Sequence, residues 1–536
     1  MEHLEQKKKI TIMLAVMSAL LFASLNQTIV GTALPRIVSD LGGFEYYSWI
    51  FTVYMLAASV TSILTGKLSD IYGRKPFILV GLAIFIIGTF LNGLAENIIQ
   101  LIIYRGIQGF GGGMIMSTAF TAVSDLFSPR ERGRWQGILG AVFGLSSVFG
   151  PTLGGWIVDH TDWHWIFWVF LPFGIIAFFL ILSLFPSVET KEKEPIDYAG
   201  SIFLTLTIVP MLLAFSWAGT KYEWDSWQII SLFTFSAIAL GLFILAEKKA
   251  KSPVLPLQLF KNSIFSLSNA IGFLIGLGMF STIMYMPFFV QGVIGTSAAS
   301  SGIVTMPMML SMVIASSIGG QFITKNGKYK FQAAVGLLLL TVGMLLLSFM
   351  DIDTTKTIVV INMIVVGIGV GMSMPIFTLT VQNSVSPNLT GVATASAQLF
   401  RQIGGTVGVA VMGTLMNTLL NNKMTELIAE SEAMKKINKA NPNVTDQLSQ
   451  LQNPQLLTNP EQLAKISQTI PDQLKPFFEQ MLQYMREALS YSLTGMFLLG
   501  AVIISLSLLL LYFLKEVPLR ETKKNENRGD IETTAS

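Results

Sequence analysis

Apolar runs of about 20 residues recur along the whole chain, separated by short polar loops. Each run is long enough to cross a hydrocarbon layer of about 30 Å as a helix, and we predict about fourteen such spans. Only 12% of the residues are charged, against about 25% in soluble domains, so lipid is the expected solvent. The predicted span cores cover residues 11–34, 47–66, 77–95, 98–123, 137–158, 164–185, 197–218, 226–246, 264–290, 300–323, 332–350, 356–381, 392–416 and 488–514.

The lysines and arginines fall mainly in alternate loops, which indicates the orientation of the spans. Cations in short loops stay on the cytoplasmic side. Placing the N-terminus inside gathers most loop cations on that side, for example Lys7 to Lys9, Arg74, Lys75, Arg132 and Lys249, and leaves few beyond Arg36, Lys221 and Lys356 outside. The first apolar run lacks a small-residue cleavage site, so we expect it to be retained as a span. The pattern predicts a multi-pass protein with both termini cytoplasmic.

The composition argues against several classes of function. The chain has no cysteine and three histidines, which removes thiolate chemistry, disulfides and most zinc sites. His160 and His164 stand four apart, but they lie beside tryptophans in an external loop, where aromatic anchoring at the membrane interface is the plainer interpretation. The net charge of +3 suggests no nucleic-acid partner. No convergent cluster of nucleophile, base or metal ligands is present, so we expect neither an enzyme nor a bound cofactor or metal.

The loop after the second predicted span carries charges between glycines at a fixed spacing: Gly66, Asp70, Gly73, Arg74 and Lys75. Glycines let helix ends approach closely, and a buried acid facing a basic pair can hold one conformation and release it in another. The plainer interpretation is an ordinary basic cytoplasmic loop. The spacing G-x-x-x-D-x-x-G-R-K resembles motif A of the major facilitator superfamily.

The fourth predicted span contains Arg105, Gln108 and Gly109, followed by three further glycines, and resembles motif B of that superfamily. An arginine inside a span is costly unless it is paired or hydrated, so we expect Arg105 to face a cavity. The alternative is that Arg105, which lies in the first half of its helix, snorkels to the outer interface.

The fifth predicted span contains Gly144, Gly150, Pro151, Gly154 and Gly155, and resembles motif C, the antiporter signature. Glycines at helical spacing let two backbones pack closely, and Pro151 bends the helix by removing a hydrogen bond. A close-packed, bent helix at the inner gate suits directional export. Generic packing of small residues is the alternative.

The resemblance extends to the second half of the chain and implies the domain organisation. Residues 319–328 look like a degenerate motif A that lacks its acid, and the span with Gln398 and Arg401 resembles the corresponding helix of fourteen-span drug:proton antiporters. The implied architecture is an all-α major facilitator fold. Its expected parts are a six-helix bundle (1–190), an inserted pair of spans (191–261), a second bundle (262–515) that includes a polar external insertion (417–487), and a cytoplasmic tail (516–536). We expect the insertion to form a cap of short helices, acting as a lid or docking element or simply tolerated on a surface loop.

One position departs from this subfamily. Its members usually have aspartate where this chain has Asn26, and asparagine cannot titrate. No acid falls in the middle of a predicted span, and the nearest are Asp125 and Asp159 at span ends. Either could carry the exchanged proton, the substrate itself could carry the charge, or transport could be uncoupled. The plainer interpretations are that Asp125 pairs with Arg130, Arg132 or Arg134 and that Asp159 is solvated at the interface.

The resemblance implies export of hydrophobic or cationic amphipathic compounds, such as antibiotics and dyes, in exchange for protons, by a monomer in a bacterial cell membrane. Methionine and phenylalanine would supply adaptable apolar walls. The alternatives are a flippase or exporter of a native lipid or metabolite on the same fold, and a membrane sensor that has lost transport. Polar groups that could orient a substrate in the cavity are Asn26, Gln27, Tyr54, Asn269, Tyr285, Gln382, Gln398 and Arg401.

Overall fold

Long helices form nearly the whole of the molecule, because a helix satisfies every backbone hydrogen bond of a membrane span within one segment. The computed structural model describes residues 4–41, 47–186, 197–219, 221–296, 298–326, 328–430, 457 and 475–516. No β-strand forms within these ranges, so the predicted all-α polytopic fold is confirmed. The main helices are α1 (Gln6–Leu41), α2 (Tyr47–Tyr72), α3 (Arg74–Asn92), α4 (Ile98–Leu126), α5 (Pro129–His160), α6 (Trp165–Trp168), α7 (Leu171–Leu184), α8 (Tyr198–Trp217), α9 (Trp227–Lys249), α10 (Ser263–Phe288), α11 (Ala298–Asn326), α12 (Lys330–Ser348), α13 (Lys356–Asn383), α14 (Thr390–Glu430) and α18 (Lys475–Phe513).

Thirteen helices of the described ranges are long and apolar enough to cross a membrane, and α4 is not among them. Its polar residues, among them Gln100, Arg105 and Gln108, lower its hydropathy. Nevertheless α4 is 29 residues long and packs along both α2 and α3. With α4 included, the described helices match the expected fourteen spans.

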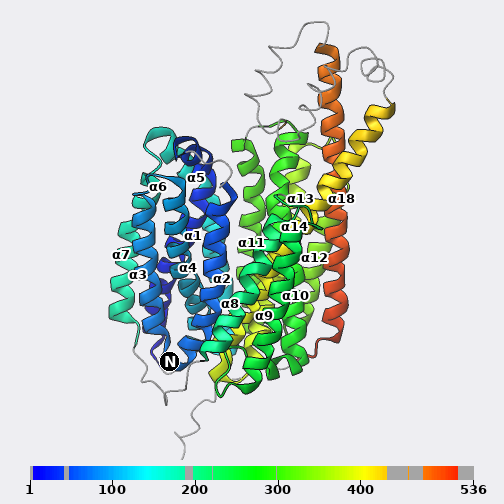
Figure 1. The fold of residues 1–536 in the computed structure, drawn as a ribbon. Coiled ribbons are helices and arrows are strands. Elements are labelled where there is room, and N and C mark those ends of the chain that lie inside the picture. Colours follow the sequence, from blue (N-terminus) through cyan, green and yellow to red (C-terminus); the bar gives the residue numbers. More distant parts are fainter. Residues whose placement is uncertain are drawn as a thin grey trace, which may run out of the picture.

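The helices form two bundles with separate hydrophobic cores (Figure 1). Buried side chains of α1 to α5 and α7 make the first core, and those of α10 to α14 and α18 make the second. The inserted pair, α8 and α9, shares a smaller apolar cluster with α2 and α14, which form one of the contacts between the two bundles. Trp49 of α2 packs against Trp217 of α8, with ring centroids 5.4 Å apart.

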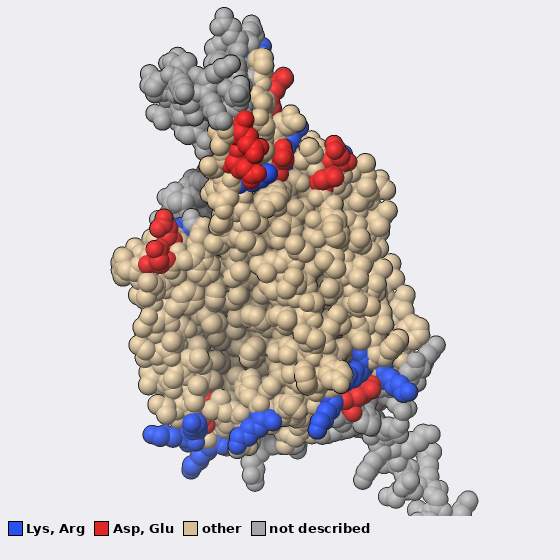
Figure 2. Space-filling view, turned by 90° about the vertical axis from the view of Figure 1, so that its right-hand side faces the viewer, with Lys and Arg blue, Asp and Glu red and all other residues tan. Residues whose placement is uncertain are grey.

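Both ends of the described chain lie at one face of the molecule, which we call the termini face; the opposite side is the cap face. The N-terminus and the end of α18 lie at the bottom of Figure 1. Figure 2 shows lysine and arginine along this lower rim, most of the acidic groups towards the opposite rim, and a nearly uncharged surface between them. That band has the character of a lipid-facing belt.

Two helices extend well past the others at the cap face (Figure 1). α14 has 41 residues and α18 has 39. The expectation of short helices across 417–487 is wrong at both ends, since 417–430 continue α14 and 475–487 begin α18. Apart from Leu457, the segment between them lies outside the described residues.

Candidate functional site

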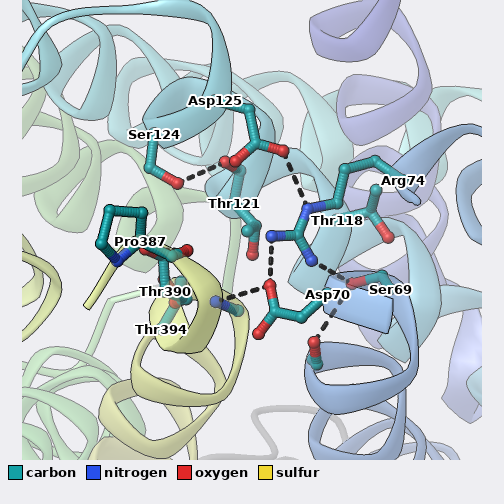
Figure 3. Close-up of polar contacts among 12 residues, drawn as sticks. Ser69, Asp70, Arg74, Thr118, Thr121, Ser124, Asp125, Pro387, Thr390 and Thr394 are labelled. Atoms are coloured by element: carbon teal, nitrogen blue, oxygen red, sulfur yellow. Dashed lines mark hydrogen bonds and ion pairs between the residues drawn. The ribbon is translucent and has the colours of Figure 1, made fainter. Parts of the chain in front are cut away.

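Arg74 is the centre of a charged cluster at the termini face (Figure 3). It begins α3 directly after Gly73, whose φ of 86° is a conformation that glycine adopts without strain. The buried guanidinium donates from Nε to Asp125 Oδ2 at 2.9 Å and from Nη1 to Ser69 Oγ at 2.6 Å, and Nη2 pairs with Asp70. Asp125 therefore pairs with Arg74, which precedes it in the chain. Arg132 donates to the carbonyls of Ser124 and Phe127.

Asp70 links the first bundle to the second. Its Oδ1 accepts the backbone N–H of Gly391, and its Oδ2 accepts that of Val392, each at 3.1 Å. These N–H groups belong to the first turn of α14, where free donors and the helix dipole favour an anion. A Cβ added at Gly391 would lie 2.5 Å from Asp70 Oδ1 and from Gly66 O, so only glycine fits this crossing. We call the contact between Asp70 and the start of α14 the latch.

A second seam joins α5 to α11. A Cβ at Gly137 would lie 2.6 Å from Ser316 O, and one at Gly133 would lie 3.4 Å from Gly320 O. Further along α5, a Cβ at Gly144 would collide with Val313. By contrast, a Cβ at Gly155 would meet nothing within 4 Å. The two bundles thus meet along the half of α5 nearer the termini face, and this close packing does not extend to Gly155.

The motif C residues divide between two neighbours. Gly144 faces α11, whereas Gly150 lies against Thr28 of α1, whose Oγ1 donates to Ser146 O at 2.8 Å. Gly154 is buried. α5 continues as one helix through Pro151, although the side chains of Pro151 and Asp159 lie outside the described residues.

Arg105 lies in a fully enclosed polar network and does not snorkel outward. Its exposed fraction is 0%, its Nη1 donates to Gln108 Oε1 at 2.5 Å, and its guanidinium lies 4.6 Å from the centre of the Tyr54 ring. Gln108 donates in turn to Thr89 at 2.6 Å and accepts from Asn92 at 3.0 Å. Arg105 Nη2 has no partner in the described structure, and no carboxylate forms an ion pair with it there.

The polar residues expected in a cavity are dispersed. Asn26 and Asn269 are buried and donate to the backbone of their own helices. Others join elements: Gln27 Nε2 lies 3.4 Å from Met55 Sδ, Tyr285 donates to Val409 O, Gln382 donates to Thr394, and Gln398 accepts from Ser62.

Arg401 does line a small cavity, of about 10 Å³ and with room for about one water molecule, between α10, α13 and α14. Its other lining residues include Ser268, Met374, Phe377 and Thr378, which sequence reasoning missed because nothing in the sequence distinguishes them from ordinary span residues.

Among the residues the structure describes, no group of three or more His, Cys, Asp or Glu could hold a metal ion. His160 stacks on Trp156, and His164 lies 2.5 Å from Asp162. Burial raises the pKa of Asp162, but hydrogen bonds from His164 outweigh this effect and hold the pKa below its usual range.

Two bundles of membrane helices that meet along polar, glycine-lined seams define a polytopic transporter. A family model for the Major Facilitator Superfamily matches residues 16–409, and the chain belongs to that superfamily. It is 39% identical over 535 residues to the multidrug transporter protein MdtP of Bacillus subtilis, covering 99% of this chain and 97% of that protein. It is 35% identical to multidrug resistance protein 3 of the same organism, covering 97% and 98% of the two chains.

Among solved structures, the human organic anion transporter MFSD10 (TETRAN) has the same fold, with a TM-score of 0.60 at 15% identity. The superposition covers 92% of this chain and 99% of that one. The family match and the similarity to multidrug transporters over nearly the whole chain show that it is a major facilitator transporter and not an enzyme.

Proposed function

We propose that this chain exports amphipathic drug-like compounds from a bacterial cell in exchange for protons, with its termini face toward the cytoplasm. The observation that carries the proposal is the latch, a charged contact between two bundles at one face, in a chain similar to multidrug transporters over nearly its full length. The basic rim at the termini face supports the orientation, since short cytoplasmic loops are rich in lysine and arginine.

In this orientation the structure is closed toward the cytoplasm. Capture of a cytoplasmic compound then requires the seams to part, which breaks both bonds from α14 to Asp70. A small interface of this kind can serve as the bistable element of alternating access.

The proposed coupling to protons acts on the carboxylates of the same charged cluster. A protonated Asp70 is a weaker acceptor for the α14 N–H groups and loses its attraction to Arg74, so protonation favours the open latch. Asp125 bonds to the same Arg74 and so belongs to the same charged cluster. Asn26 cannot take this part, and its buried amide donates to Phe22 O.

The test is accumulation of Hoechst 33342 in inverted membrane vesicles, with pH and voltage gradients imposed separately. We expect uptake that follows an acidic lumen, ceases when nigericin collapses the pH gradient, and falls in Asp70→Asn and Asp125→Asn. Asp159→Asn and Asn26→Asp show whether α5 or α1 shares the coupling. Uptake that ignores the pH gradient would refute proton exchange, and absence of uptake of any drug-like compound would refute export.

A further inference from the structure

Arg401 is a charge in the middle of the membrane without a protein partner among the described residues. It lies eleven residues after the start of α14, about 16 Å along the helix axis and so near the centre of a layer about 30 Å thick. An arginine at this depth is costly unless it is paired or solvated. Within the part of the chain that the structure describes, Arg401 makes no hydrogen bond, ion pair or ring contact.

The cavity beside Arg401 has further unsatisfied polarity. Ser268 of α10 is only 1% exposed, lines the cavity, and its Oγ has no partner in the described structure. Thr378 of α13 adds a second hydroxyl to the lining. A Cβ at Gly272, another lining residue, would meet nothing within 4 Å, so there is open space on this side of α10. A guanidinium and two hydroxyls can all donate hydrogen bonds, as an anion requires.

The surrounding helices offer no compensating negative charge. α10, α11, α12 and α13 contain no Asp or Glu, and the acids of α14 and α18 lie in their extensions at the cap face. Asp70, the carboxylate that reaches this bundle from the other, is engaged at the start of α14. The apolar part of the cavity lining, which includes Ile275, Met374 and Phe377, suits a hydrocarbon or aromatic body.

We propose that this small cavity, once widened as the bundles part, binds the acidic group of amphipathic organic acids, with the carboxylate on Arg401 and Ser268 and the apolar body against Phe377 and Met374. The inference rests on the proposed export function and specifies its substrate class at this site: acids instead of the cations that the family resemblance implies. Arg105 is not part of the site, because Gln108 and the Tyr54 ring enclose it.

The test compares two ligands that share one body and differ in charge: 1-pyrenebutyrate and its trimethylammonium analogue. Binding to the purified full-length chain in phosphatidylcholine nanodiscs is followed by fluorescence anisotropy. We expect the acid to bind at least about tenfold more tightly than the cation, and Arg401→Met to weaken acid binding about 30-fold, as loss of a charged hydrogen-bond donor implies. Arg401→Lys should recover part of the affinity, and Ser268→Ala should weaken it less than Arg401→Met does.

Lys423→Met is the matched control, because it removes one cation from the same helix outside the cavity and should leave acid binding unchanged. Equal affinity for the two ligands, or an Arg401→Met affinity within about threefold of the parent, overturns the site. Thermal stabilisation by chloride that depends on Arg401, without pyrenebutyrate binding, overturns the organic-acid assignment as well.

Vesicle transport separates this inference from the proposed function. If acid binding depends on Arg401 but the protein transports neither pyrene compound nor Hoechst 33342, the site is supported and export is refuted. Export of Hoechst 33342 by a chain whose acid binding ignores Arg401 supports export and refutes the site.

Discussion

Replacing Asp70 with asparagine should release the termini face. Asp70 accepts two backbone N–H groups of α14 at 3.1 Å, and a hydrogen bond to a charged group contributes about 1.5–3 kcal/mol. Asparagine retains one acceptor oxygen without the charge, so we expect a loss of about 2 kcal/mol between the bundles, which raises the open fraction about 30-fold.

The chain has no cysteine, so a single introduced thiol reports opening without background. Ser316→Cys is a conservative reporter, because Ser316 is 4% exposed and lies at the α5–α11 seam, away from the latch itself. In inverted vesicles, the rate of labelling by a membrane-impermeant maleimide follows the open population when opening is faster than labelling.

Asp162→Asn is the control. Asp162 lies in the loop after α5, where it pairs with His164 and not with the latch, so its variant should label within about threefold of the parent. The refuting result is a labelling rate for Asp70→Asn within about twofold of the parent rate, in protein whose unfolding temperature is unchanged. It would show that the latch does not hold the termini face closed.

Three further perturbations follow from the same contacts. Gly137→Leu places a side chain against Ser316 O, so we expect export to be lost. With Ser62→Cys as the thiol reporter, labelling should be at least about tenfold faster. Gly241→Leu, which has open space for a side chain, should change neither export nor the labelling rate. Arg74→Met leaves Asp70 buried without its cation, so we expect the free energy of unfolding to fall by about 3–5 kcal/mol. Thermal unfolding in detergent measures this change. An unchanged unfolding midpoint would show that the ion pair does not stabilise the fold. Arg105→Met removes a buried charge that has no acid partner in the described structure. We therefore expect export to fall while the unfolding temperature stays the same or rises. A large drop in the unfolding temperature would contradict this account.

The sequence predicted the helices well because lipid leaves a span few alternatives. It predicted the extensions of α14 and α18 poorly, since hydropathy reports where lipid ends and not where a helix ends. Residues 417–430 are too polar for lipid, yet they continue their helix.

Motif spacing identified Asp70 and Arg74, but not their distant partners. Gly391 lies 321 residues from Asp70, and Asp125 lies 51 residues from Arg74. The cavity residues were the least predictable part, because polar type alone does not reveal whether a side chain such as Asn26 or Asn269 bonds to its own helix or faces open space.

The length of α14 has a mechanical consequence. One continuous helix of 41 residues begins at the latch and ends beyond the opposite face, a distance of about 60 Å. If α14 tilts as one piece when the latch opens, a tilt of about 10° at its base displaces its far end by about 10 Å. The position of the projecting end of α14 on one side of the membrane would then depend on whether the latch on the other side is open or closed.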